Sequence, residues 1–360
     1  MRTPLRTTLL ALVLVASALA GCATKSPPPP PPSGGGRMAD IAGFAPGGTF
    51  MGEDDGTIIR ELDAMHRTGA RWLRTDFNWS GMEAQRGVFN TWKQDKIVKW
   101  ARARNIQIIA LVAYTPGWAQ PANCRQPTCG PRDPWDYARF LKKVVAHFSP
   151  MGVKHYEIWN EPNQYFWWGP KPSPKAYTSL LRAAYPTAKS VDRGITIIAG
   201  AFAPTADSRD GRFIRSTTYV KSMYNNGAGR YFDAISIHPY SGDAPPAVGG
   251  DWNMMTSVMP DIYATMRSHG DGNKKIWGTE MGYSTSGKRA VSEITQGLYI
   301  QQSYQLWTKY PYTAGLMTFT FRDMGTDRRA TFANYGLLRR DFSPKASLRI
   351  FDQTMQMRQN

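Results

Sequence analysis

Cysteine is scarce in this chain of 360 residues, which contains only three. Two of them, Cys124 and Cys129, stand in the stretch NCRQPTCG, whose proline and glycine predict a loop. A metal site there would need further ligands, and the nearest histidine in the sequence is His147. We therefore expect a disulfide that closes this loop, as the compartment of an exported protein allows, and we expect no metal or cofactor.

The N-terminus lacks an apolar run long enough to span a bilayer, since the run at residues 9–20 is too short. Arg2 and Arg6 precede this run and LAGC follows it, which is the layout of a secretory signal. A cysteine directly after Leu-Ala-Gly resembles the bacterial lipobox, in which that cysteine is acylated. We expect a lipoprotein signal peptide at residues 1–21 and lipid attachment at Cys22; the alternative is an ordinary secreted protein with a spare cysteine.

Residues 22–37 contain no apolar side chain that could join a core, and they include six consecutive prolines. Such a segment favours an extended polyproline helix, which predicts a stalk that lifts a domain off a membrane. No second linker interrupts the remaining residues, so residues 38–360 are expected to form a single domain. The expected location is outside the cytoplasm, with the protein lipid-anchored to the bacterial membrane and facing the envelope or cell surface.

Acidic residues are fewer than basic ones, and the formal net charge is +17. Loss of Arg2 and Arg6 with the signal peptide would leave +15. No run of Lys and Arg is longer than two residues, so the charges are scattered along the chain. We interpret them first as a solvated basic surface, second as a preference for an anionic envelope polymer, and we expect no nucleic acid partner.

Eight apolar runs of strand length alternate with segments of helical periodicity, such as PWDYARFLKKVVAHF. The strands are expected at 39–45, 71–77, 105–114, 154–160, 195–202, 232–240, 274–282 and 314–321. Eight alternating units predict parallel strands that close into a (β/α)8 TIM barrel. An open doubly wound sheet is the alternative fold, but the glycines of FAPGGTF do not have the G-x-G-x-x-G spacing of a phosphate loop.

Active sites of such barrels lie at the carboxyl ends of the strands. The polar and aromatic residues expected there are Arg74, Asp76, Trp118, Asn160, Glu161, His238, Tyr240, Glu280, Arg322 and Asp323. Glu161 and Glu280 follow strands four and seven, which stand roughly opposite each other. Two facing carboxylates among aromatic side chains are what glycoside hydrolysis needs. Glu157 lies deeper in its strand and is expected to pair with a basic group inside the barrel.

Two motifs at these positions resemble a known group of enzymes. IWNEPN resembles the acid/base signature of clan A glycoside hydrolases, and IWGTEMGY resembles their nucleophile signature. The stretch from FNWSGMEAQRG to YTPGWA resembles family 39 and its cellulase-like, exopolysaccharide-cleaving relatives. The resemblance implies a retaining mechanism with the two carboxyl groups in the short-separation class, Glu161 as general acid/base and Glu280 as nucleophile.

The resemblance also assigns roles to the residues around the glutamates. Asn160 would hydrogen-bond the hydroxyl beside the anomeric carbon, and Tyr240 would hold the Glu280 carboxylate. His238 would line the same wall, and Arg74 would keep the nucleophile ionised. From the residues alone, Arg74 could equally form a structural ion pair with Asp76.

The tryptophans divide into two groups. Trp118, Trp167 and Trp168 stand in loops after strands three and four, where an indole could stack on a sugar ring, and we expect them to bind substrate. The others singled out, expected in the core, are Trp72, Trp100, Trp159 and Trp307. Many clan relatives place a tryptophan at the end of strand eight, where this chain offers Phe319 or Phe321.

The expected function is that of a monomeric, retaining glycoside hydrolase that cleaves a cell-envelope or extracellular polysaccharide internally. After strand eight, SPKASLRIFDQTM is enough for one helix, so we expect no C-terminal β-sandwich. The alternatives are an exo-glycosidase and a non-catalytic carbohydrate-binding lipoprotein. Loss of either glutamate would favour the latter, and both are present.

Overall fold

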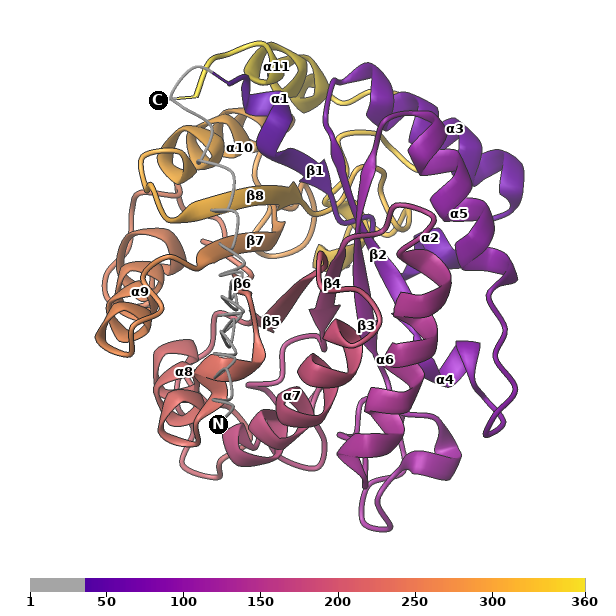
Figure 1. Cartoon of the computed structure of the whole chain (residues 1–360). Helices are drawn as coiled ribbons and strands as arrows, with labels where there is room; N and C mark the ends of the chain where they lie inside the picture. Colours follow the sequence, from indigo (N-terminus) through magenta and orange to yellow (C-terminus); the bar gives the residue numbers. More distant parts are fainter. Residues whose placement is uncertain (1–35, 360) are drawn as a thin grey trace, which may run out of the picture. The chain divides into compact units, whose positions relative to one another are not determined.

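Eight parallel strands form a closed barrel in a computed structural model that describes residues 36–359 (Figure 1). Each strand pairs with the next along the chain, and β8 pairs with β1. The strands are β1 (Ala42–Phe44), β2 (Trp72–Asn78), β3 (Gln107–Ala113), β4 (His155–Ile158), β5 (Thr196–Phe202), β6 (Ala234–Ile237), β7 (Lys275–Met281) and β8 (Thr313–Thr318). The expected (β/α)8 barrel is confirmed, and the alternative open sheet is wrong.

Helices follow the strands in turn and form the outer ring of the barrel (Figure 1). The outer helices are α3 (Asp55–Arg67), α5 (Trp92–Ala103), α6 (Pro134–Phe148), α7 (Pro174–Lys189), α8 (Ser216–Asn225), α9 (Met259–Ser268), α10 (Glu293–Trp307) and α11 (Ala346–Met355). Shorter helical segments are α1 (Met38–Ile41), α2 (Gly48–Gly52), α4 (Trp79–Met82), η1 (Gly117–Ala119), η2 (Ala228–Tyr231), η3 (Met254–Val258) and η4 (Thr331–Asn334).

Side chains that precede the outer helices explain where several of them begin. Asp54, Asp133, Ser173 and Ser292 each accept a hydrogen bond from a backbone N–H in the first turn of α3, α6, α7 and α10. These contacts satisfy donors that a helix leaves open at its start. Proline also occupies the first turn of α6 and α7, where its fixed φ suits the helix.

The first strand is shorter than its apolar pattern predicts. Residues 38–41 form α1, and β1 covers only Ala42–Phe44. Asp40 stabilises the helical turn, because its carboxylate accepts a hydrogen bond of 2.8 Å from the backbone N–H of Arg37. The expected sixth and eighth strands also end early, at Ile237 and Thr318, which leaves residues 238–240 and 319–321 in the loops at the carboxyl ends of the strands.

Apolar side chains fill the barrel as well as the layer between strands and helices. Inside the barrel, the ring of Trp72 packs edge-on against Trp277 and against His155, with centroids 5.0 and 4.9 Å apart. Burial lowers the pKa of His155 to about 4, so this histidine is neutral near pH 7. These three side chains fill the barrel at the end where the strands begin.

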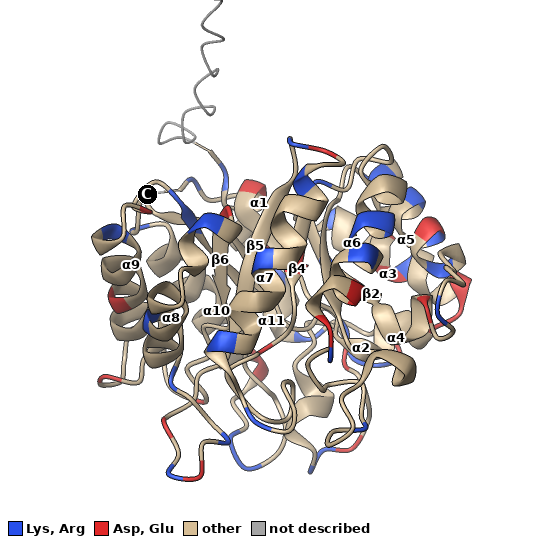
Figure 2. Ribbon diagram, turned by 60° about the horizontal axis from the view of Figure 1, so that its bottom comes forward, with Lys and Arg blue, Asp and Glu red and all other residues tan. Residues whose placement is uncertain are grey.

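Basic residues are spread over the surface of the barrel, and the structure describes the chain from residue 36. Lys and Arg lie on several outer helices and on loops rather than in one patch in the view of Figure 2. The expected signal peptide, the lipidated Cys22 and nearly all of the Pro-rich linker lie outside the described residues. Within residues 36–359, no helix combines the length and the apolar character needed to cross a membrane.

Candidate active site

The chain turns sharply where β4 ends, and this turn presents Asn160 and Glu161. Trp159 and Glu161 have positive φ angles of 75° and 43°, a backbone region that non-glycine residues seldom occupy. The N–H of Glu161 donates to the carbonyl oxygen of Ala201 at 3.0 Å, which ties the turn to β5. Uncommon backbone geometry of this kind recurs at functional sites, where it aims a side chain that regular structure would point elsewhere.

Arg74, on β2, connects three side chains through its guanidinium. Its Nε lies 2.6 Å from Glu157 Oε2, its Nη1 lies 2.6 Å from Glu280 Oε1, and its Nη2 donates to Asn160 Oδ1 at 2.8 Å. Glu157 is fully buried and accepts a further hydrogen bond from Ser236, so its expected pairing inside the barrel is confirmed. Asp76 forms no ion pair with Arg74 within the described part of the chain.

Glu280, at the end of β7, is held by a donor on each carboxylate oxygen. Arg74 contacts Oε1, and the hydroxyl of Tyr240 donates to Oε2 at 2.8 Å. Burial alone would raise the pKa of Glu280, but the charges of His238 and Arg74 and the hydrogen bonds from Tyr240 and Arg74 lower it. The site therefore keeps Glu280 ionised.

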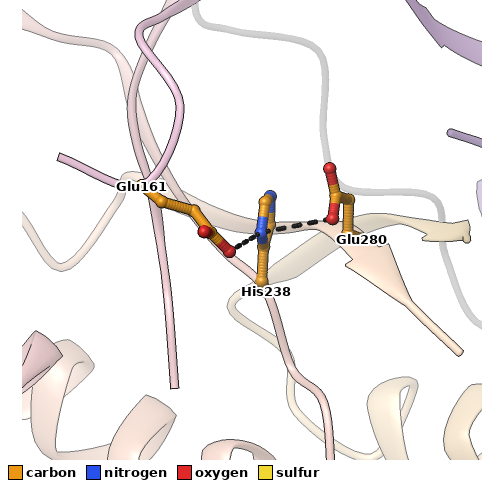
Figure 3. A group of neighbouring side chains, drawn as sticks. All are labelled: Glu161, His238 and Glu280. Carbon is orange, nitrogen blue, oxygen red and sulfur yellow. Dashed lines mark hydrogen bonds and ion pairs between the residues drawn. The ribbon is translucent and has the colours of Figure 1, made fainter. Parts of the chain in front are cut away.

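Glu161 faces Glu280 across His238, which lies between the two carboxylates (Figure 3). His238 is fully buried, and its Nδ1 lies 2.8 Å from Glu161 Oε1 and 3.5 Å from Glu280 Oε2. Because both neighbours of Nδ1 are carboxylate oxygens, Nδ1 carries a proton and donates a hydrogen bond to Glu161. The second oxygen of Glu161 accepts a hydrogen bond from the amide of Gln164.

The separation of the two carboxyl groups bears directly on their chemistry. One ligand atom each from Glu161, His238 and Glu280 lies within 4.8 Å of the others. Retaining glycosidases have carboxyl groups about 5–5.5 Å apart, whereas inverting enzymes need about 6.5–9.5 Å to admit a water molecule. One oxygen of Glu161 and one of Glu280 thus lie close enough together for the shorter class. A metal ion would compete with Arg74 and Tyr240, which already bind both oxygens of Glu280.

The mouth of the barrel contains further groups that the sequence did not single out. Tyr114, at the end of β3, has a φ of 74°, and burial together with the charge of Asp76 raises its pKa. Asp76, by contrast, was expected there from the sequence; burial raises its pKa to about 6, Arg74 opposes this rise and Glu280 adds to it. Gln164 and Tyr335 are the other residues that the sequence did not single out. Only Gln164 had a local signal, because it follows Glu161 by one turn in EPNQ.

Two of the three tryptophans expected to bind substrate lie differently from the expectation. Trp168 is only 4% exposed and packs on Trp159 and Tyr177, so its expected role as a platform is wrong. Trp167 and Trp168 are adjacent in the loop after β4, and the backbone there turns the indole of Trp168 back into the core. Trp118 is partly buried and donates from Nε1 to the carbonyl of Glu83 at 2.9 Å, with Arg86 5.3 Å from its ring centroid.

Trp167 remains at the candidate site. Its side chain is half-buried and lies 5.9 Å, centroid to centroid, from the ring of Tyr114. The four tryptophans expected in the core all pack there: Trp72, Trp159 and Trp307 are buried, and Trp100 lies partly buried against the core.

Three aromatic side chains that the sequence analysis did not name stand on loops at the carboxyl ends of the strands. Phe166, Trp252 and Phe332 follow β4, β6 and β8, and they are 53%, 54% and 71% exposed. Sequence patterns did not reveal them because nothing in a loop's composition tells which aromatic faces solvent. Exposed aromatic rings on several loops are suited to a ligand longer than one sugar ring.

The end of β8 supplies one aromatic residue to the site. Phe319 packs edge-on against Tyr240 and Tyr335, with centroids 6.2 and 5.4 Å apart. Phe321 instead packs on Phe44 in the layer outside the barrel. Of the two phenylalanines considered from the sequence, Phe319 is therefore the one beside Glu280.

Arg322 and Asp323 were also expected at the carboxyl ends of the strands, but the structure directs them away from the two glutamates. Arg322 pairs with Glu61 of α3 at 2.8 Å, and Asp323 pairs with Lys345 at 2.8 Å. Both pairs are buried and fasten the loop after β8 to the outer layer of the barrel.

The expected disulfide between Cys124 and Cys129 is present. It closes the loop after β3, and Cys129 forms a backbone bridge with Gly169 in the loop after β4. A Cβ atom on Gly169 would lie 2.7 Å from Cys124 Sγ, so only glycine fits against the disulfide. The disulfide thus braces the segment that follows Trp167 and Trp168.

The fold and the site together define a (β/α)8 barrel with two opposed carboxylates at the carboxyl ends of β4 and β7. No protein-family model matches the sequence, and no curated protein does. Solved structures do resemble it. A family 39 glycoside hydrolase from Bacteroides cellulosilyticus WH2 has a TM-score of 0.73 at 23% identity, over 89% of this chain and 64% of that one.

Two further structures show the same likeness. The GH39 enzyme from Xanthomonas axonopodis pv. citri has a TM-score of 0.67 at 16% identity, over 90% of this chain and 68% of that one. A monomeric β-xylosidase from Caulobacter crescentus CB15 has a TM-score of 0.68 at 16% identity, over 91% and 70%. The structural neighbours are therefore glycoside hydrolases, and the resemblance expected from the sequence is confirmed at the level of the fold. This chain spans about two thirds of their length.

Proposed function

We propose that this protein is a retaining glycoside hydrolase in which Glu280 is the nucleophile and Glu161 the general acid/base. One observation carries the proposal: one oxygen of each glutamate lies within 4.8 Å of the other, and of the two glutamates only Glu280 is bound by both an arginine and a tyrosine hydroxyl. An ionised carboxylate can attack carbon, and a second carboxyl group that can carry a proton can release the leaving oxygen.

In the first step, a Glu280 oxygen forms a bond to the anomeric carbon while the bond to the leaving oxygen breaks. The proton of Glu161 passes to that oxygen, which departs as a hydroxyl group. In the second step, a water molecule gives a proton to Glu161 and attacks the same carbon, which releases Glu280 as a carboxylate. Two displacements at one carbon restore its configuration.

Asn160 supports this chemistry through the orientation of its amide. Its Oδ1 accepts a hydrogen bond from Arg74, so its Nδ2 is the group available to a sugar hydroxyl. Such a contact suits the hydroxyl beside the anomeric carbon, where hydrogen bonds strengthen in the transition state.

The test is the anomeric configuration of the first product, followed by NMR on a substrate of defined anomer. Retention is the expected outcome, and an inverted product would refute the assignment of Glu280 as nucleophile. Absence of any hydrolysis across a panel of polysaccharides and aryl glycosides would instead favour a non-catalytic carbohydrate-binding protein.

We infer further that cleavage is internal to a cell-envelope or extracellular polysaccharide. The exposed rings of Phe166, Trp252 and Phe332 support this inference, because they stand on three separate loops at the end of the barrel that carries the two glutamates. A ladder of oligomers in mass spectra of early products would support endo action. Release of monosaccharide alone would show exo action.

We also propose that Cys22 is acylated and that the stalk holds a monomeric enzyme on the outer side of a membrane. The support is the sequence pattern of residues 1–22 and the Pro-rich segment that follows. Cys22→Ala should move the protein out of the membrane fraction or leave it as unprocessed precursor. Unchanged processing and fractionation would rule out the anchor.

A further inference from the structure

A hollow of about 330 Å³ lies at the end of the barrel that carries the candidate site, among the loops that follow the strands. Three loops contribute to it: residues 204–206 follow β5, Trp252 comes from the loop between β6 and α9, and Arg289 comes from the loop after β7. Arg215 and Ser216 at the start of α8, together with Met254 and Val258 of η3, complete the wall. This volume lies within the range of about 300–1,000 Å³ that small-molecule sites occupy.

The charge of the lining is one-sided. It includes two arginines, Arg215 and Arg289, and no aspartate or glutamate. Arg289 is exposed, and within residues 36–359 it makes no hydrogen bond and no ion pair. A guanidinium without a protein partner beside a hollow is available to an anionic ligand.

Arg215 is held in place by its neighbours. Its Nη2 donates to the backbone oxygen of Asp251, and its backbone N–H donates to Asp207 Oδ1 at 2.8 Å. Asp207 also accepts from Thr218 at 2.9 Å, so both of its oxygens are engaged, and it is not among the residues that line the hollow. Arg215 precedes α8, which begins without a capping side chain.

Trp252 adds an apolar surface to these charges. Its side chain is 54% exposed, which is unusual for the largest aromatic residue. A flat indole beside guanidinium groups suits a ligand with a ring and a negative charge, because the ring can stack while the charge is paired.

Arg289 reaches from the hollow toward the residues around Glu280, because a Cβ atom on Gly242, two residues after Tyr240, would lie 3.3 Å from Arg289 Nη1. Burial and the charge of Glu280 raise the pKa of Tyr335 to about 12, and Arg289 opposes this rise, so both charges act on the same hydroxyl. The ring of Tyr335 also contacts Tyr240, the residue that donates to Glu280, at 6.1 Å between centroids. The loops that form the hollow follow β5, β6 and β7, so the hollow lies at the same end of the barrel as Glu280.

We propose that this hollow is a subsite for a carboxylate-bearing sugar unit, such as a hexuronic acid, of a polysaccharide that reacts at Glu161 and Glu280. Arg289 and Arg215 pair with the carboxylate, and Trp252 stacks on the ring. The proposal rests on the proposed glycosidase function for its link to cleavage. It makes the substrate an acidic glycan.

The first experiment measures binding alone, by a ligand-observed NMR titration of the full chain with glucuronate and with glucose. Glucuronate should bind and glucose should not, and Arg289→Gln should weaken glucuronate binding by about tenfold, as loss of a hydrogen bond to a charged group predicts. Arg329→Gln removes the same charge from an exposed position outside the hollow and should leave binding unchanged. Equal binding of the two sugars, or no effect of Arg289→Gln, would overturn the proposal.

The second experiment compares hydrolysis of a uronic-acid polymer with hydrolysis of the same polymer after its carboxyl groups are reduced. Arg289→Gln should lower kcat/KM about tenfold on the acidic form and leave the reduced form and a short aryl glycoside unaffected. Equal rates on both forms in the unmodified protein would overturn the acidic subsite but leave the glycosidase function standing. Glucuronate binding without hydrolysis of any substrate would uphold the subsite and refute the glycosidase function.

Discussion

The guanidinium of Arg74 lies 2.6 Å from the carboxylate of Glu280, although 206 residues separate them in the chain. The same guanidinium also binds Glu157 and Asn160, so it positions one buried carboxylate, the candidate nucleophile and an amide beside the candidate acid/base. A planar group with five donors in a fixed arrangement suits this task, and a lysine could not replace it. A single residue of β2 therefore fixes the relative positions of three side chains from β4, β7 and the turn after β4.

Substitution of the two glutamates should have different effects, because their proposed roles differ. Glu280→Ala should abolish hydrolysis of every substrate, since no nucleophile remains. Glu161→Ala should still attack aryl glycosides whose leaving group needs no proton, and azide should accelerate it because azide needs no general base. Steady-state rates on an activated aryl glycoside, with and without azide, provide the measurement.

Glu161→Gln serves as the matched control, because it keeps the shape of the side chain and removes only its acid/base chemistry. It should show the same selectivity for activated leaving groups. Full activity in the Glu280 variant would contradict the mechanism, whatever the behaviour of Glu161.

Tyr240→Phe should move the acidic limb of the pH profile of kcat/KM to higher pH. The hydrogen bond from Tyr240 is one of the interactions that lower the pKa of Glu280, which must be ionised to attack. Activity is lost as the pH falls through that pKa, so a less depressed pKa makes the loss begin sooner. Tyr335→Phe is the control, because Tyr335 lies nearby without a hydrogen bond to Glu280 among the described residues. An unshifted limb in Tyr240→Phe would argue against the role of this hydroxyl.

Asp76→Asn should stabilise the fold at neutral and alkaline pH. Burial raises the pKa of Asp76 to about 6 from 3.8, so its ionisation disfavours the folded state. The favourable contribution of the protonated group is complete below about pH 3.8 and is lost as the pH rises through about 6, by at most about 3 kcal/mol. The Tm of the variant should therefore match that of the unmodified protein near about pH 4 and exceed it near about pH 8. A constant difference in Tm across this range would contradict the prediction.

Trp168→Ala and Trp167→Ala should separate stability from substrate binding. Loss of the buried indole of Trp168 leaves a cavity in the core and should cost about 3–5 kcal/mol of unfolding free energy. Trp167→Ala should leave Tm nearly unchanged and raise KM on long substrates by roughly three- to tenfold with kcat unaltered.

A short aryl glycoside provides the control for Trp167, because it does not reach beyond the reacting sugar. An equal loss on short and long substrates would place Trp167 in the core instead. A stable Trp168→Ala protein that binds long substrates weakly would restore the original interpretation of Trp168.

Much of the fold could be predicted from the sequence, because strand and helix periodicity are local properties. The eight apolar runs, the caps Asp133 and Ser173 and the alternation of elements all lie within short segments. The positions of Glu161 and Glu280 at strand ends followed from the same segments. The deep pairing of Glu157 was also predictable, because a carboxylate inside a barrel requires a basic partner.

The tertiary structure alone decided which partners these side chains meet. Whether Arg74 pairs with Asp76 or with Glu280 depends on how β2 and β7 lie across the barrel, and no local pattern records that relation. Loops that are distant in the chain likewise decide three other features. They turn Trp168 into the core, leave Trp252 exposed and bring the two arginines to the hollow. The sequence by itself determined the alternation of strands and helices and the place of the two glutamates at strand ends, because periodicity is a property of one element at a time. The surroundings of the site came from contacts between elements, which exist only when the barrel has closed.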